Sequence, residues 1–380
     1  MSSAVLIGAG EARYRRHPGP ETTTETLLVE AAHAALDDAQ LERKDIDAMA
    51  LSSFTLAPDH AIDLAWRLGL NVRWLMEDTN GGASGLNMLQ HAARAVEAGD
   101  ATRVLILAGD RMGATEFARL AASYNVVTRD YLAPLPCEGP NTLFSFLTQR
   151  HMDLYGLARE DYGQIAVAQR GWAMLNPRAV YRESLSIEEY MRAPMVAPPL
   201  CRYDCVPVVS GADAVVVASG DAVSGRPCAS VRAIVASYNP DNQESDGLRT
   251  GLADAAPALW RAAGCEPKDI DLASVYDDYP VMVLILLNDL GMIRDGDLSR
   301  FLHHRIGTER WPLNTSGGML SAGQAGAAGG LHGLVEAVTQ LCDSAGARQI
   351  PARHALVVGY GMVLARYGAC ANAAVLERIA

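Results

Sequence analysis

The sequence is short of positive charge, and that shortage excludes one class of partner. Its 32 Lys and Arg residues are outnumbered by 44 Asp and Glu residues, which gives a formal net charge of −12. Proteins that bind nucleic acid place clustered Lys and Arg on phosphates, so nucleic acid is not expected as the main partner. An anionic small molecule could still bind, but only through a local basic patch.

Paired cysteines, a leader segment and long hydrophobic runs are also lacking. Seven cysteines, an odd number, do not form a disulfide framework, and no second pair completes a zinc site with Cys201 and Cys205. The start of the chain leads directly into the strand-like Val5–Gly8 without a basic segment. Apolar runs such as Val281–Leu287 are far shorter than a bilayer span. We expect a soluble, cytoplasmic protein with no membrane partner and no bound metal.

Short apolar segments alternate with helical patterns along both ends of the chain. Strands are expected at residues 4–8, 47–52, 72–76, 103–109 and 213–219, and helices at 27–38, 61–70 and up to 98. Such alternation predicts an α/β fold with a largely parallel sheet. Residues 111–207 break this pattern, with one clear helix at 159–175, and are interpreted as an insertion for substrate and subunit contacts.

A glycine-dense loop, Asn314–Gly330, precedes a helix whose apolar residues face one side. Gly317, Gly318, Gly323 and Gly326 allow positive φ and let backbone approach a ligand closely. The free N–H groups at the helix start favour negative charge, so the loop is suited to an oxyanion or a polar ligand. Close helix–sheet packing is the alternative interpretation, with about equal weight, because glycine-rich runs have low specificity.

An internal repeat organises the whole chain. The Lys-Asp-Ile-Asp sequence that ends at Asp47 recurs at Asp271, each time after an Ala-rich helix and always 224 residues apart. A second glycine loop, Asn80–Gly85, stands in the first half as Asn314–Gly330 does in the second. The repeat predicts a first half at residues 1–228, which includes the insertion, and a second half at 229–380. The two loops are expected to meet at one site.

Three motifs resemble the thiolase superfamily, in particular sterol-carrier-protein-type thiolases and thiolase-like lipid-transfer proteins. They are Asp204-Cys-Val-Pro207, Ser210-Gly-Ala-Asp-Ala214, and Asn314-Thr-Ser-Gly-Gly318 continuing to Gly323. The resemblance implies a duplicated thiolase fold, with two α/β halves packed α-β-α-β-α and a loop-domain insertion. It also implies a tight homodimer and an acyl-CoA substrate, with no tightly bound cofactor.

The catalytic pattern of that family is not kept. Gly82 stands where a thiolase has its cysteine nucleophile, and the nearby Ser84 has no evident base. Gln324 replaces the histidine of Gly-His-Pro, and Tyr276 replaces the histidine of His-Asp-x-Phe. The second cysteine falls on Val357 or a neighbour. Covalent acyl transfer by this chain is therefore not expected.

Two functions fit a thiolase-like chain without the cysteine. One is retro-aldol C–C cleavage of a β-hydroxyacyl-CoA, as in steroid side-chain aldolases that work with a small OB-fold, zinc-ribbon, acyl-CoA-binding partner. Such cleavage needs a base for the hydroxyl and donors for the enolate, for which Tyr276, Tyr360, Gln324 and Asp277 are the candidates. The alternative is a non-catalytic subunit that binds acyl-CoA or supports a partner enzyme. The predicted substrate-binding residues are Gly82, Ser84, Asn314, Gly317, Gly318, Ser321 and Gly323.

Other polar residues have structural interpretations of similar or greater weight. Tyr279 is as well explained as a core aromatic, and Asp277 and Asp278 either polarise Tyr276 or cap a helix at residues 281–290. The histidines at 303 and 304 are expected in a solvated loop. His91 and His332 are expected as satisfied helix histidines, and Cys205 as a structural residue.

Overall fold

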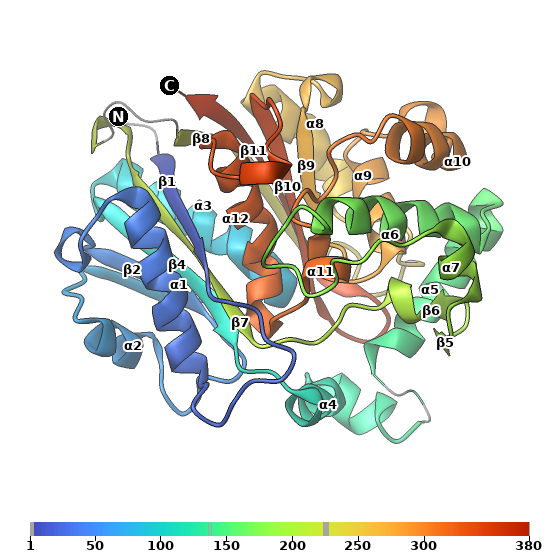
Figure 1. The fold of residues 1–380 in the computed structure, drawn as a ribbon, viewed down its shortest axis with the longest axis horizontal. Helices are drawn as coiled ribbons and strands as arrows, with labels where there is room; N and C mark the ends of the chain where they lie inside the picture. Colours follow the sequence, from blue (N-terminus) through green and yellow to red (C-terminus); the bar gives the residue numbers. More distant parts are fainter. Residues whose placement is uncertain (1–3, 136, 138, 223–227, 380) are drawn as a thin grey trace.

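The computed structural model describes residues 4–135, 137, 139–222 and 228–379. Nine strands form one sheet through the molecule, in the order β3-β2-β4-β7-β1-β8-β11-β10-β9 (Figure 1). They are β1 (Ala4–Glu11), β2 (Ala48–Ser52), β3 (Trp74–Glu77), β4 (Arg103–Asp110), β7 (Gly211–Ser219), β8 (Cys228–Tyr238), β9 (Leu272–Val275), β10 (His354–Val363) and β11 (Gly368–Ile379). A small second sheet pairs β5 (Met195–Ala197) with β6 (Leu200–Cys201).

The sheet is mixed, which corrects the expectation of a largely parallel one. Only β2–β3, β2–β4 and β9–β10 are parallel, whereas β4–β7, β7–β1, β1–β8, β8–β11 and β11–β10 are antiparallel. A tight connection between β10 and β11 leaves no room for a crossover and therefore forces antiparallel pairing. A strand that is buried on both faces is continuously apolar whether it pairs in parallel or antiparallel, so the sequence of these strands did not distinguish the two kinds of pairing.

The helices stack on the sheet in the predicted α-β-α-β-α order. α1 (Thr24–Ala39) covers the outer face of the first half, and α8 (Leu252–Ala263) covers that of the second. α3 (Ser84–Ala98) and α12 (Gly329–Leu341) lie between the halves and contact strands of both (Figure 1). The strands of the two halves join through β1 and β8, where Val5 pairs with Ser230. One hydrophobic core combines the first half with α12 and with second-half residues such as Val357, and the other combines the remainder of the second half with part of the insertion.

The sequence repeat has a physical basis in two aspartates. In each copy, the first aspartate of the turn accepts the N–H three residues earlier: Asp45 that of Glu42, and Asp269 that of Glu266, both at 2.8 Å. The second aspartate holds the start of the strand that lies parallel to the one following the turn, β4 in the first half and β10 in the second. Asp47 accepts Arg103 N–H, and Asp271 accepts His354 N–H. Both copies therefore link an outer helix to the sheet with the same hydrogen bonds.

The insertion contains more helix than its sequence indicated. Four helices occupy it: α4 (Ala114–Ser123), α5 (Pro140–Tyr155), α6 (Arg159–Ala173) and α7 (Ile187–Arg192). Only α6 was predicted. α5 was missed because it follows a glycine- and proline-containing segment and hides its apolar side under the second half, where Phe144 stacks on Tyr279 at 4.4 Å. A helix can start with proline at its first position, so Pro140 did not exclude one.

The remaining helices lie at the edges of the sheet and around the second glycine loop. They are α2 (Ala61–Leu68), α9 (Pro280–Asp289), α10 (Leu298–Arg300) and α11 (Gly318–Ala322). The segment with His303 and His304, expected as a loop, is a π-helical turn, Phe301–Thr308. Within the described ranges, none of the helices has both the length and the apolar character needed to cross a membrane.

Candidate active site

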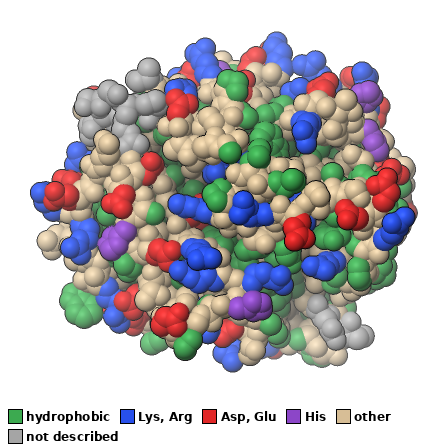
Figure 2. All heavy atoms as spheres, viewed as in Figure 1, with side chains coloured by type: hydrophobic (Ala, Val, Ile, Leu, Met, Phe, Trp, Pro, Cys, Tyr) green, Lys and Arg blue, Asp and Glu red, His purple; other side chains and the backbone are tan. Residues whose placement is uncertain are grey.

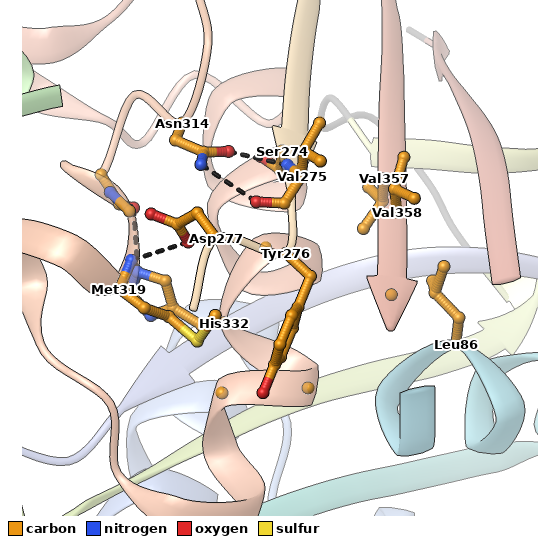
Figure 3. A pocket seen from close by; sticks show the side chains of 16 residues that line it. Leu86, Ser274, Val275, Tyr276, Asp277, Asn314, Met319, His332, Val357 and Val358 are labelled. Carbon is orange, nitrogen blue, oxygen red and sulfur yellow. Dashed lines mark hydrogen bonds between the residues drawn. The ribbon is translucent and has the colours of Figure 1, made fainter. Parts of the chain in front are cut away.

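The two glycine loops meet where α3 and α12 begin, as the repeat predicted. A Cβ on Gly330 would lie 2.7 Å from the carbonyl oxygen of Gly81, and one on Gly85 would lie 2.0 Å from that of Gly330. Beside this contact is a cavity of about 20 Å³, lined by Tyr276, Asp277, Asn314, Met319, His332 and Val357 among others (Figure 3). Residues far apart in the chain thus converge at the end of β9.

The ring of Tyr276 fills the space that a side chain at Gly82 would need. A Cβ built on Gly82 would lie 2.2 Å from Cε2 of Tyr276 and 2.1 Å from the carbonyl oxygen of Tyr360. Real Cβ atoms are not found at such distances. The Tyr276 ring therefore occupies the space beside residue 82, and glycine is required opposite it.

Tyr276 and Gln324 form the central polar contact of the site. The Nε2 atom of Gln324 donates to the Tyr276 hydroxyl oxygen at 3.0 Å. Burial, followed by the charge of Asp278, raises the pKa of Tyr276 well above its usual value. The phenol is therefore protonated at neutral pH, and its own O–H points to no other described hydrogen-bond acceptor. It is a hydrogen-bond donor ready for a substrate oxygen.

Asp277 caps a helix, but not the one expected. Its carboxylate accepts the N–H of Met319 at 2.9 Å and of Leu320 at 3.3 Å, in the first turn of α11 (Figure 3). Burial raises the pKa of Asp277 to about 6. α9 instead begins after Tyr279, whose own N–H is accepted by Asp278 at 3.0 Å. Asp277 therefore fixes the glycine loop rather than α9.

From the sequence, Asp278 had only a minor role beside Tyr276, and Tyr124 was not indicated at all. The charge of Asp278 contributes to the raised pKa of Tyr276, and burial together with Asp277 raises the pKa of Asp278 to about 8. Tyr124, at the end of α4, places its hydroxyl 2.7 Å from the position of a Cβ on Gly81. Asp278 could have been weighted from its position next to Asp277. Tyr124 gives no local signal because only the fold brings the insertion to this loop.

Tyr360 lies apart from Tyr276, although both were candidates for acid–base chemistry. Its hydroxyl accepts the N–H of Gly368 across the β10–β11 hairpin, and its ring is in the core of the second half. Gly359 and Gly361, its neighbours on β10, face the first glycine loop instead. Because side chains alternate along a strand, the Tyr360 phenol points away from that loop. Tyr279 is likewise a core aromatic, with its hydroxyl on Asn141.

The predicted substrate-binding residues have different positions. Asn314 and Gly318 line the cavity, and the Asn314 amide bonds both backbone groups of Val275. Gly317 packs on α6 and Gly323 on Val209, each with positive φ, as do Gly318 and Gly326. Ser84 is fully buried and has no hydrogen-bond partner among the described residues. Ser321 accepts a hydrogen bond from Arg170 at 3.0 Å.

His332 is a satisfied buried histidine, as expected, and it supports the cavity wall. Its Nε2 lies 2.8 Å from the Ser316 hydroxyl, and its Nδ1 lies 3.2 Å from that of Tyr14 and 3.5 Å from Asp213. Burial opposes protonation, but the hydrogen bond and charge of Asp213, helped by Glu11, raise the pKa of His332 to about 9. His91, by contrast, is exposed on α3.

Glu11, Asp213 and His332 are the one group in the described part of the chain with metal-ligand spacing, their ligand atoms lying within 4.8 Å of one another. These groups are already paired, since Tyr14 donates to Asp213 at 2.9 Å and Arg178 binds Glu11 at 3.1 Å. The cysteines offer no nucleophile here. Burial raises the pKa of Cys370, which faces Asn80, to about 11, and that of Cys205 to about 12.

The chain is similar to known proteins along most of its length. A family model described as thiolase C-terminal domain-like matches residues 235–376. The 17-hydroxy-3-oxo-4-pregnene-20-carboxyl-CoA lyase of Mycobacterium tuberculosis is 30% identical over 363 residues, which cover 89% of this chain and 91% of the lyase. The steroid side-chain-cleaving aldolase of Thermomonospora curvata is 28% identical over 88% of this chain and 89% of the aldolase. An acetyl-CoA acetyltransferase of Methanocaldococcus jannaschii is 28% identical over 90% of each chain.

Solved structures show the same fold. The Ltp2-ChsH2(DUF35) aldolase superimposes with a TM-score of 0.82 at 24% identity, covering 99% of this chain and 98% of its own. The acetyl-CoA acetyltransferase from Syntrophomonas wolfei superimposes with a TM-score of 0.71 at 16% identity, covering 99% of both chains. The relatives named above are a lyase, an aldolase and acetyltransferases, which confirms the predicted enzyme class. The chain belongs to the thiolase superfamily, as an enzyme.

Proposed function

We propose that this enzyme cleaves a C–C bond in a β-hydroxyacyl-CoA by a retro-aldol reaction. The observation that carries the proposal is the Tyr276 ring in the space of the missing nucleophile, with its hydroxyl bonded to Gln324. Relatives named as a lyase and a steroid side-chain-cleaving aldolase support it. A steroid side chain is accordingly the acyl group that we propose to test first.

The reaction needs one proton acceptor and one set of donors, and no cysteine. A base takes the proton of the β-hydroxyl, the Cα–Cβ bond breaks, and its electron pair forms the enolate of a shortened thioester. The β-carbon leaves as a ketone or an aldehyde. The enolate then takes a proton at Cα and becomes the shortened acyl-CoA. No oxidant or reductant is consumed.

The protonation state of each residue decides whether it serves as a hydrogen-bond donor or as the proton acceptor. Tyr276, protonated because burial raises its pKa, donates together with the Gln324 amide to the oxygen that gains negative charge. Burial raises the pKa of Asp278 to about 8, and Asp278 is the base that accepts the proton of the β-hydroxyl. Asp277 holds the start of α11 in place beside them. Turnover should therefore rise with pH through about 8, and Asp278→Asn should remove that rise.

The similar proteins suggest one partner for this enzyme, and one edge of the sheet suggests a second. The solved Ltp2-ChsH2(DUF35) aldolase has a second component, and we propose that this enzyme also acts with a small OB-fold, zinc-ribbon protein that binds acyl-CoA. We further propose a homodimer, because β3 is an edge strand whose Leu75 and Met76 are only half-buried. An edge strand with apolar residues readily pairs with a second copy. Light scattering of the purified chain tests the dimer.

A direct assay tests the reaction. Purified enzyme, alone and with its OB-fold neighbour, is incubated with a panel of β-hydroxyacyl-CoA esters, and the products are identified by mass spectrometry. The proposal predicts a shortened acyl-CoA and an equimolar ketone or aldehyde. Tyr276→Phe is the matched variant, because it removes the hydroxyl and keeps the ring that fills the space beside Gly82.

A non-catalytic subunit that binds acyl-CoA or supports a partner enzyme is the second candidate, because the small cavity argues against chemistry at this site. A volume of about 20 Å³ holds a water molecule but no acyl group, so a substrate must displace side chains before chemistry can begin. Tight binding of every ester with no product, in the complex as well as alone, would establish this second function and end the retro-aldolase proposal.

A further inference from the structure

Three arginines and two tyrosines gather on the outer side of the second glycine loop. Arg16, Arg170 and Arg202 lie over the ring of Tyr181 at 5.3, 5.1 and 6.0 Å from its centre. Arg170 and Arg202 also lie over Tyr203, at 5.5 and 5.7 Å. We call these five residues the arginine–tyrosine cluster. Three cationic groups thus share one small region of a protein whose net charge is −12.

None of these arginines forms an ion pair within 4.0 Å among the described residues. Elsewhere in the described chain, arginines such as Arg348 and Arg178 have a carboxylate within that distance, at Glu336 and Glu11. Arg170 is buried and forms hydrogen bonds only to neutral groups: its Nε donates to Ser321, and its Nη1 to the carbonyl oxygen of Glu183. The charges of Glu183 and Glu189 act on Arg170 without such an ion pair. Burial lowers the pKa of Arg170, as expected for a cation removed from water.

An uncompensated buried guanidinium is costly, and like charges placed together add to that cost. The tyrosine faces offset only part of it, because a cation over an aromatic ring gains about 0.5–2 kcal/mol. An anion that accepts several hydrogen bonds would compensate the remainder. Guanidinium forks match the oxygens of a phosphoryl group, which makes phosphate the anion that three converging arginines suit best.

The cluster is joined directly to the candidate active site through α11. Ser321, which accepts the Arg170 bond, lies on α11, and its carbonyl oxygen accepts the N–H of Tyr181 at 3.0 Å. The first turn of the same short helix holds Asp277 beside Tyr276. A ligand could therefore bind the cluster with one end and approach Tyr276 with the other.

The cluster opens onto the surface. Arg16 also lines a surface hollow of about 560 Å³ beside Tyr181, whose charged lining consists of three arginines and two glutamates: Arg13, Arg16, Arg178, Glu11 and Glu30. Figure 2 shows Lys and Arg side chains gathered over the middle of this face, where Figure 1 places α11 and the segment that follows α6. Arg16 and Arg202 are exposed, so they can receive a ligand from solvent, whereas Arg170 forms the base of the cluster.

We propose that the arginine–tyrosine cluster is a phosphoryl-binding site that holds the phosphate-bearing end of the CoA thioester. The identity of the ligand rests on the proposed function, because acyl-CoA is the substrate class that brings phosphates to this protein. The site itself rests on the unpaired arginines. It accounts for how an acidic protein binds a highly anionic substrate.

Calorimetric titration with CoA tests the site without requiring turnover. Arg16→Gln and Arg202→Gln remove one exposed cation each, and the expected result is a Kd raised about 10-fold by each change, since a charge-assisted hydrogen bond contributes about 1.5–3 kcal/mol. The double variant should weaken CoA binding further and reduce the dependence of binding on salt. Arg261→Gln, an exposed arginine on α8 with no ion pair in the described chain, is the matched control and should leave Kd unchanged.

Two further ligands separate the sources of phosphate. Pantetheine lacks the phosphates and should bind the wild-type and variant proteins alike, whereas pyrophosphate should compete with CoA in the wild-type protein only. Unchanged CoA affinity in the double variant would overturn the site. Pyrophosphate binding that depends on the cluster, without any effect on CoA, would overturn the CoA assignment. If no ester is cleaved while CoA binding still depends on the cluster, the retro-aldolase fails and this site stands.

Discussion

Adding a single methyl group at Gly82 tests whether Tyr276 has taken the place of the nucleophile. In Gly82→Ala the new carbon would lie 2.1 Å from the Tyr360 carbonyl oxygen and 2.2 Å from Cε2 of Tyr276. The carbonyl belongs to β10 and cannot move without shifting the strand. The ring can retreat, but only by giving up its bond to Gln324.

The expected cost follows from these two contacts. Overpacking a tight site costs about 1–3 kcal/mol, and losing a buried hydrogen bond about 1 kcal/mol. Urea denaturation should therefore show a loss of about 2–4 kcal/mol in the free energy of unfolding. Gly82→Cys should be destabilised at least as much and should show no thiolysis, because Gln324 and Val357 provide no base.

Two variants make the comparison decisive. Gly171→Ala, inside α6, is the control: its methyl group would meet only a guanidinium nitrogen of Arg310 at 3.6 Å, and it should be as stable as the wild type or more stable by up to about 1 kcal/mol, because alanine is favoured over glycine within a helix. The double variant Gly82→Ala/Tyr276→Ala should be destabilised by less than the sum of the two single variants, because the ring clash is absent from it while the carbonyl clash remains. If Gly82→Ala matches the control in stability, or Gly82→Cys catalyses robust thiolysis, the spatial replacement described here is refuted.

Three further predictions concern single side chains. Tyr276→Phe should lower kcat at least 100-fold with unchanged CoA affinity, as expected for a general acid or donor; wild-type turnover in steady-state assays would remove Tyr276 from the chemistry. Tyr360→Phe should reduce stability by about 1 kcal/mol through the lost bond to Gly368 and leave kcat unchanged; abolished turnover in a folded variant would restore Tyr360 to the mechanism. Asp213 raises the pKa of His332 to about 9, from an unfolded value of about 6.5. Protonated His332 therefore adds up to about 3 kcal/mol of stability, which is complete below pH 6.5 and is lost as the pH rises through 9. In denaturation curves at pH 6 and pH 10, His332→Gln should reduce this loss of stability with pH, and an unchanged loss would contradict the buried ion pair.

Local patterns in the sequence were sufficient for the duplicated architecture. The repeated Lys-Asp-Ile-Asp turn predicted two equivalent halves because each aspartate bonds backbone within a few residues or at the start of a neighbouring strand of the sheet. Four glycines of the second loop, Gly317, Gly318, Gly323 and Gly326, were predicted to allow positive φ, and all four adopt it. Gly82 and Gln324 were recognised from their places in motifs. These features depend on short segments whose chemistry is visible one residue at a time.

Contacts between distant segments decided the remainder. Tyr276 and Tyr360 both end up near loops aimed at the site, but only the pleat of β10 turns the Tyr360 phenol toward Gly368 and away from Gly82. Asp277 caps α11 rather than α9 because the fold brings Met319 N–H to it across 42 residues of chain. The same holds for Tyr124 and the arginine–tyrosine cluster. Sequence determined which chemical groups this protein carries, and packing determined which of them meet, because strand direction, side-chain facing and burial are set by segments that are far apart in the chain.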